Sequence, residues 1–213
     1  MRFEAVETRL AAFPAILPPP SEALMPVVLG EGPQRRTRRE PPPGRAVRPA
    51  AVLVLLYPDP VGDARLVLIE RTDGGGHHSG EVSFPGGKAE TNDPDLVATA
   101  LREASEEVGL DPAAAGVRVV GQLDRLWIPV SDFQVTPIVA LAARTPRLVP
   151  QPFEVARILE PSVATFLPGV DVPIVERRVS GWDLRYGHYE VDGASVWGAT
   201  ARVLSQLGAV LGG

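Results

Sequence analysis

A glycine turn followed by a glutamate-rich helix constrains this chain more than any other feature. The turn is Phe84-Pro85-Gly86-Gly87, and the helix carries Arg102-Glu103-Ala104-Ser105-Glu106-Glu107-Val108-Gly109-Leu110. Glu103, Glu106 and Glu107 stand at i, i+3 and i+4, where like charges on one helical face repel by about 0.2–0.5 kcal/mol per pair. Mg²⁺ is usually held by a few carboxylates together with substrate phosphates. The cluster therefore predicts a metal site for phosphate chemistry, and its alternative is a solvated acidic helix face.

The helix that carries these glutamates also has an apolar stripe, which predicts that it packs by one face and presents the carboxylates on the other. The stripe consists of Val97, Ala100, Leu101, Ala104 and Val108. Asn92 or Asp93 can cap the start of the helix, and Pro94 suits a first turn. Gly109 suits the left-handed residue that ends it.

The turn and the helix together resemble the Nudix box, G-x5-E-x7-R-E-U-x-E-E-x-G-U, in which U is a bulky aliphatic residue. The second half matches at Arg102, Glu103, Ala104, Glu106, Glu107, Gly109 and Leu110. In the first half, Asp93 stands six residues after Gly87, where the box has Glu, and eight rather than seven residues separate it from Arg102. One extra residue in this turn is a feature of the coenzyme A branch of the Nudix hydrolase family.

A second motif, upstream of the turn, is similar to one of that branch, L-L-T-x-R-[SA]-x3-R-x3-G-x3-F-P-G-G. Arg71, Gly80 and the Phe84 to Gly87 segment match at the right spacing. Three positions depart from the motif: Ile69 replaces Thr, Thr72 replaces Ser or Ala, and Gly76 replaces the second Arg. Weaker similarity continues through residues 131–137 and 196–201. The resemblance to the coenzyme A diphosphatase branch thus covers about residues 48 to 207.

The resemblance implies roles for individual residues. The implied metal ligands are Gly87, through its carbonyl, and Glu103, Glu106 and Glu107. The implied substrate-binding residues are Arg71, His78, Gly80 and Phe84. Arg102 is expected to orient a neighbouring glutamate through an ion pair, and the general base is expected to be Glu106 or Glu154, the latter from a loop after the box. His78 and Glu154 have alternatives as ordinary packing or surface residues.

The implied reaction is hydrolysis of the diphosphate bond of coenzyme A or its derivatives, with Mg²⁺ or Mn²⁺ as cofactor, giving 3′,5′-ADP and 4′-phosphopantetheine. A diphosphate is shielded by anionic oxygens, and bound divalent metals neutralise that charge and orient water. Two alternatives stay open. One is a Nudix diphosphatase for another nucleoside diphosphate derivative, such as ADP-ribose or NADH, and the other is a non-catalytic module that senses a nucleotide.

Composition agrees with one compact enzyme domain. The chain has 213 residues, 45% of them hydrophobic, which is enough to bury a substantial core. It has no cysteine, so a disulfide framework or a thiolate metal site is excluded. A net charge of -5 argues against extensive nucleic-acid binding. We expect no membrane span, no signal peptide, a soluble monomer or homodimer, and by default a cytoplasmic location.

The chain divides into a Pro/Arg-rich N-terminal arm with a short helix, residues 1–47, and a Nudix hydrolase domain, residues 48–213. Arginines 35, 36, 38 and 39 of the arm could meet an extra substrate phosphate or form a solvated linker. Patterning predicts an α/β or α+β chain, and the resemblance implies a Nudix-type α/β/α sandwich around a mixed β-sheet. Predicted strands cover 51–57, 64–71, 81–84, 117–123, 126–129, 135–141, 177–179 and 187–191, and a C-terminal helix covers 197–211.

Overall fold

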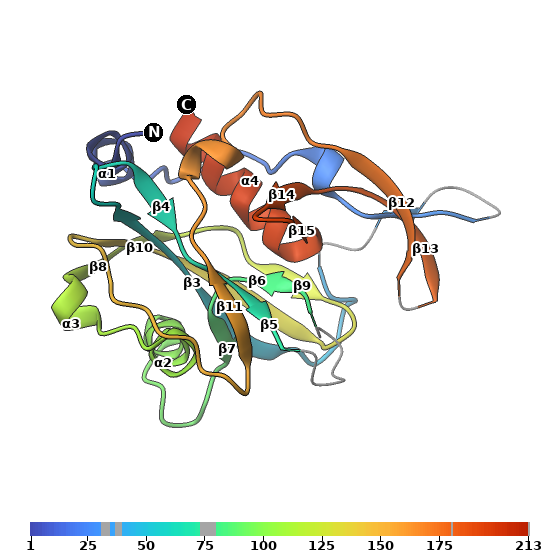
Figure 1. Ribbon diagram of the computed structural model, residues 1–213. Helices are drawn as coiled ribbons and strands as arrows, with labels where there is room; N and C mark the ends of the chain where they lie inside the picture. The colour runs from blue at the N-terminus through green and yellow to red at the C-terminus, as the bar shows by residue number, and fades with distance from the viewer. Residues whose placement is uncertain (31–34, 37–39, 73–79, 180, 213) are drawn as a thin grey trace.

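The computed structural model describes residues 1–30, 35–36, 40–72, 80–179 and 181–212 (Figure 1). A mixed β-sheet lies at the centre, with helix α2 (Leu96–Val108) on one face and helices α1 (Phe3–Ala11) and α4 (Gly198–Gly212) on the other. This α+β fold has the α/β/α layering around a mixed sheet that the sequence predicts.

The middle of the sheet consists of β3 (Arg48–Pro58) and β10 (Phe133–Ala142), which run parallel. Their antiparallel neighbours are β4 (Ala64–Leu66) and β7 (Gly86–Lys88) on β3, and β8 (Val117–Gln122) and β9 (Leu126–Ile128) on β10. The predicted strands at 51–57, 117–123, 126–129 and 135–141 are therefore confirmed. The pairing of β7 with β3 brings the glycine turn onto the central sheet.

Strand β3 is almost continuously apolar because helices cover both of its faces. Its residues alternate between two buried clusters. Val54 and Leu56 pack in the cluster that contains α1 and α4, whereas Leu53 and Leu55 pack in the cluster that contains α2. The catalytic-type helix is thus fixed against the sheet through a core of its own.

The segment predicted as one strand, 64–71, is two strands in two sheets. Ala64–Leu66 pairs with β3 and completes the predicted hairpin. After Val67, the chain enters β5 (Leu68–Arg71), which pairs with β11 (Val155–Leu159) and with β6 (Val82–Ser83) in a separate three-stranded sheet. The single-strand prediction is wrong because periodicity shows β structure without showing which partner each half pairs with.

A third sheet has the order β12-β13-β1-β2 and extends to one side of the molecule (Figure 1). Its members are β12 (Ile174–Val179), β13 (Trp182–Gly187), β1 (Val27–Val28) and β2 (Arg35–Arg36). The predicted strand at 187–191 is interrupted at His188, whose N–H donates to the Pro173 carbonyl at 3.1 Å. Beyond it, β14 (Tyr189–Val191) and β15 (Ala194–Val196) form a hairpin.

That hairpin turns at Asp192-Gly193, as predicted, with φ of 47° and 78°. The remaining elements are short: α3 (Pro112–Ala115) and the 3₁₀ turns η1 (Glu22–Leu24) and η2 (Val163–Phe166).

The N-terminal helix, predicted within residues 1–13, is present as α1. Phe3, Val6 and Leu10 are buried in the same cluster as α4, so the start of the chain contributes to the core beside the central sheet. The helices in the described part of the chain are all too short or too polar to cross a membrane.

The N-cap of α2 is Asp95 rather than Asn92 or Asp93. The Asp95 carboxylate accepts a hydrogen bond from the Ala98 N–H at 2.8 Å. Asp93 lies outside the helix and uses its side chain elsewhere in the site. The predicted end of the helix is confirmed, because Gly109 has a left-handed φ of 64°.

Candidate active site

Glu107 is the most buried acidic residue of the site, with only 2% of its surface exposed. One carboxylate oxygen accepts from the Gly86 N–H at 2.8 Å, and the other accepts from Arg71 Nη1 at 3.1 Å. The sequence predicts that all three glutamates face away from the packed side of the helix. That is wrong for Glu107, which lies at the edge of the packed face and reaches the glycine turn.

The glycine turn is closely packed on both sides. A Cβ atom at Gly86 would lie 2.4 Å from the Ala51 carbonyl oxygen, and one at Gly87 would lie 2.5 Å from the Glu103 carboxylate. No side chain fits at either position without displacing backbone or the carboxylate. The main chain of the turn therefore lies directly against two of the three glutamates.

Arg102 connects the glutamates to the loop before the helix. Its Nη1 donates to Glu103 and to Glu106, each at 3.0 Å, so the ion pair predicted for this residue is present. Its other nitrogens reach Asp93 at two atoms, both at 3.0 Å, and the Lys88 carbonyl at 3.2 Å. This fork holds the guanidinium in one orientation.

Asp93 serves as the carboxylate partner of the box arginine. Besides Arg102, it accepts from the Thr99 hydroxyl and from the Glu90 N–H, each at 2.9 Å. These contacts, the Arg102 guanidinium first among them, hold the pKa of Asp93 far below its ordinary value. The sequence could not assign this role, because the spacing from Asp93 to Arg102 is one residue longer than in the box.

Burial sets the protonation of the two inner glutamates. It raises the pKa of Glu107 to about 7, against the opposing effects of the Gly86 N–H and Arg71. Burial also raises the pKa of Glu103, although the Arg102 hydrogen bond lowers it. Glu154 contributes a smaller rise to both values. Negative charge thus accumulates here beyond what the two arginines neutralise, which is the condition that a bound cation relieves.

The loop before β11 brings Glu154 to the site. The Gln151 N–H donates to the Glu107 carbonyl at 2.8 Å, at the end of α2. The Thr72 N–H donates to the Glu154 carbonyl at 3.0 Å, at the end of β5. The loop is therefore fixed between the helix that carries the metal-ligand candidates and the strand that carries Arg71, and its role as source of a general base stays a prediction.

The other substrate-binding candidates are distributed differently. Phe84 is buried in the cluster that contains α4, so in this structure it packs instead of facing a ligand. Gly80 lies in an exposed turn just before β6. His78 lies outside the described residues, as do Arg38 and Arg39 of the arm. Two backbone groups that the sequence gave no sign of, the Gly86 N–H and the Lys88 carbonyl, hold Glu107 and Arg102.

The donor set suits a hard divalent cation, because it consists of carboxylate oxygens beside a glycine carbonyl. Within the described residues, no three His, Cys, Asp or Glu side chains are already gathered closely enough to hold a metal ion. Arg71 and Arg102 occupy the carboxylate oxygens instead. The residues fit a divalent metal in type and position, and binding one requires that these ion pairs open.

Comparisons with known proteins agree with this geometry. A family model described as the NUDIX domain matches residues 47–161. An uncharacterized Nudix hydrolase NudL of Pectobacterium atrosepticum is 39% identical over 164 residues, which cover 75% of this chain and 81% of that protein. The chain belongs to the Nudix hydrolase family.

Further relatives lie in the same family. Nudix hydrolase 15, mitochondrial, of Arabidopsis thaliana is 35% identical over 76% of this chain, and the match spans 58% of the plant protein. A solved Nudix hydrolase from M. smegmatis, RenU, aligns with 65% of this chain and 80% of its own, at 24% identity and a TM-score of 0.46.

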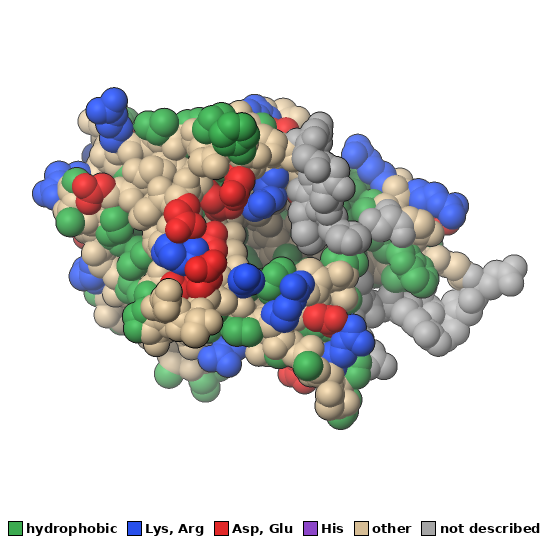
Figure 2. Space-filling view, turned by 90° about the horizontal axis from the view of Figure 1, so that it is seen from below, with side chains coloured by type: hydrophobic (Ala, Val, Ile, Leu, Met, Phe, Trp, Pro, Cys, Tyr) green, Lys and Arg blue, Asp and Glu red, His purple; other side chains and the backbone are tan. Residues whose placement is uncertain are grey.

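The Nudix glutamates form an acidic surface cluster. In the view from below, acidic side chains gather on one face with basic side chains among and beside them (Figure 2). Glu106 is the most accessible of the three, with 59% of its side chain exposed, and Glu103 is intermediate at 17%. The cluster therefore offers a gradient from a buried, partly protonated carboxylate to a solvated one, which suits both holding a cation and meeting water.

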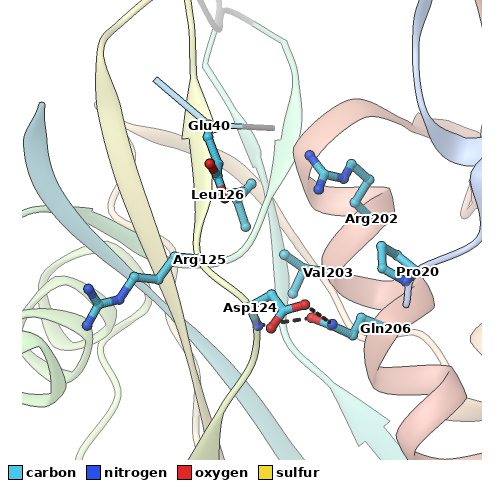
Figure 3. A pocket seen from close by; sticks show the side chains of 8 residues that line it. All are labelled: Pro20, Glu40, Asp124, Arg125, Leu126, Arg202, Val203 and Gln206. Atoms are coloured by element: carbon cyan, nitrogen blue, oxygen red, sulfur yellow. Dashed lines mark hydrogen bonds between the residues drawn. The ribbon is translucent and has the colours of Figure 1, made fainter. Parts of the chain in front are cut away.

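A separate hollow of about 370 Å³ lies between α4 and the segment joining β8 to β9 (Figure 3). Gln206 lies at its wall and bonds the Asp124 N–H at 3.0 Å, the Asp124 carboxylate at 2.7 Å and the Pro18 carbonyl at 3.0 Å. None of its lining residues belongs to the Nudix box, so we place the reaction at the carboxylate cluster. The lining residues are Pro20, Glu40, Asp124, Arg125, Leu126, Arg202, Val203 and Gln206.

Proposed function

We propose that this Nudix hydrolase cleaves the diphosphate bond of coenzyme A or its derivatives, giving 3′,5′-ADP and 4′-phosphopantetheine, with Mg²⁺ or Mn²⁺ as cofactor. One observation carries the proposal. Arg71 and Gly86, which come from the upstream motif that resembles the coenzyme A branch, both contact Glu107 of the Nudix box. The two motifs therefore contribute to a single site.

The proposed roles follow from position. Glu103 and Glu107 are the principal metal ligands, with Glu106 as a third ligand or a water-mediated partner and the Gly87 carbonyl beside them. A bound divalent cation supplies charge neutralisation and orientation of water. Arg102 positions Glu103 through the ion pair described above, and Asp93 fixes Arg102.

The proton that leaves the attacking water needs an acceptor. Glu106 and Glu154 are the two candidates, because both are exposed to solvent and border the buried carboxylates. Arg71 is positioned to meet a substrate phosphate once Glu107 binds a cation. We place this reaction in the cytoplasm by default.

Product analysis tests the proposal. The pure protein is incubated with coenzyme A, ADP-ribose and NADH in parallel, with Mg²⁺, with Mn²⁺ and with EDTA. Metal-dependent release of 3′,5′-ADP from coenzyme A is the expected result. Cleavage of ADP-ribose or NADH alone would keep the metal site and overturn the substrate assignment, and failure to cleave all three would favour a nucleotide sensor.

A further inference from the structure

Phe153 is a large aromatic side chain that the fold leaves in solvent. It is 86% exposed, although it lies one residue before Glu154 on the loop that borders the acidic cluster. Figure 2 shows apolar side chains directly beside the acidic ones on this face. Scattered apolar residues on a surface are ordinary, so exposure alone carries no conclusion. The way in which the main chain is held decides the matter.

The loop around Phe153 is anchored at several points. The Phe153 carbonyl accepts from the Thr72 hydroxyl at 2.9 Å, and its N–H donates to the side-chain oxygen of Gln151. Gln151 and Val149 in turn donate N–H bonds to the carbonyls of Glu107 and Val108, at 2.8 and 2.9 Å. Both polar groups of the Phe153 backbone are therefore used, and the ring is exposed on a held loop.

A held loop that presents an exposed aromatic ring next to charged catalytic-type groups has the properties of a binding surface. The neighbouring carboxylate of Glu154 is close enough to influence the protonation of both Glu103 and Glu107. A substrate whose diphosphate meets those glutamates therefore extends one of its ends past this loop. Of the groups on a nucleoside diphosphate, the base is the flat aromatic one.

We propose that Phe153 is a platform on which the base of the nucleoside diphosphate substrate stacks. This inference rests on the proposed function, since it names the residue that meets the base at the same site. Stacking of a base on an aromatic side chain tolerates different bases, because each base has a π-face. Phe153 then contributes to affinity for the nucleoside end of the substrate and leaves the hydrolytic step itself to the carboxylates.

The first test is kinetic and uses Phe153→Ala, Phe153→Leu and Phe153→Trp, with Val61→Ala as a control at an exposed position in the turn between β3 and β4. We expect Phe153→Ala to raise the KM for a nucleoside diphosphate substrate about 5- to 100-fold with kcat little changed. Phe153→Leu should resemble Phe153→Ala, whereas Phe153→Trp and Val61→Ala should resemble the unchanged protein. An unchanged KM in Phe153→Ala, or full recovery by Leu, would overturn stacking.

The second test needs no turnover and so separates this inference from the proposed reaction. In EDTA, AMP should quench the fluorescence of Phe153→Trp more than that of the unchanged protein, and ribose 5-phosphate, which lacks the base, should not. Equal quenching of the two proteins by AMP, or equal effects of the two ligands on Phe153→Trp, would refute the platform even if hydrolysis is found. Base-specific quenching without hydrolysis would support the platform and refute the proposed reaction.

Discussion

Replacing Glu107 by Gln should stabilise the metal-free protein above neutral pH. The pKa of this carboxyl is raised from an ordinary 4.5 to about 7, chiefly by burial. Below pH 4.5 the group is protonated in both the folded and the unfolded chain. As pH rises from 4.5 to 7, the unfolded chain ionises first, so folding stability falls. Because one pH unit in pKa corresponds to about 1.4 kcal/mol, the loss approaches about 3 kcal/mol above pH 7.

Gln at position 107 keeps the acceptor for the Gly86 N–H and carries no charge, so it avoids this loss. We expect the variant to match the unchanged protein near pH 4.5 and to exceed it by about 3 kcal/mol at pH 8.5. For a chain of this length that corresponds to a rise in Tm of about 6–12 °C. Urea unfolding at a series of pH values, in EDTA, measures the difference, with Glu106→Gln as the exposed control on the same helix.

Adding Mg²⁺ or Mn²⁺ should reverse the order. A cation that binds the folded state alone raises its stability, and the unchanged protein gains more from it than the Gln variant. Metal binding near pH 7 should also release protons, which a weakly buffered titration detects. A stability difference between the two proteins that does not vary with pH, or that favours Glu107 at pH 8.5 in EDTA, would refute the assigned burial and the reasoning built on it.

Three further predictions concern the surroundings of the glutamates. Asp93→Asn should lower kcat with little change in KM, because Arg102 loses its fork, whereas Asp93→Glu should retain more activity; equal rates for both would refute the positioning role. The depressed pKa of Asp93 adds stability that is present above pH 3.8 and lost as pH falls below it, so acid titration should separate Asp93→Asn from the unchanged protein only above that value. Gly87→Ala should destabilise the fold by about 1–3 kcal/mol, since its Cβ would lie 2.5 Å from a carboxylate, and should weaken Mn²⁺ binding in calorimetry; normal stability and binding would show that the turn has room. Asp95→Ala should cost about 0.5–2 kcal/mol in urea unfolding, whereas Asn92→Ala should cost little, and the reverse order would restore the other cap.

The sequence predicts the layers of this fold well because local pattern determines them. The alternation of β3 residues between two clusters, the apolar stripe of α2 and the tight turn at Asp192-Gly193 are all set by residues close together in the chain. The break at Val67 could not be predicted in the same way. Whether Leu68 pairs with β3 or with β11 depends on a strand about ninety residues later, and no local signal encodes that choice.

The site shows the same division. The spacing of the three glutamates places them on one helix, and the structure brings the glycine turn to them. Their different burial follows from long-range contacts: Glu107 meets a backbone N–H from β7 and a side chain from β5, which spacing within the helix does not specify. The partner of Arg102 also depended on how the loop between β7 and α2 folds.

The zero-length crossing at Val67 makes two neighbouring stretches of chain unequal in what they tolerate. In β5, Arg71 stands opposite Val155, one residue after Glu154. A single inserted residue between Leu66 and Leu68 would shift that register and turn Arg71 to the opposite face of its sheet. The same insertion in the turn at 59–63 would lengthen a surface loop at little cost. Variation in chain length is therefore expected to accumulate a few residues before the crossing and to be absent at the crossing itself.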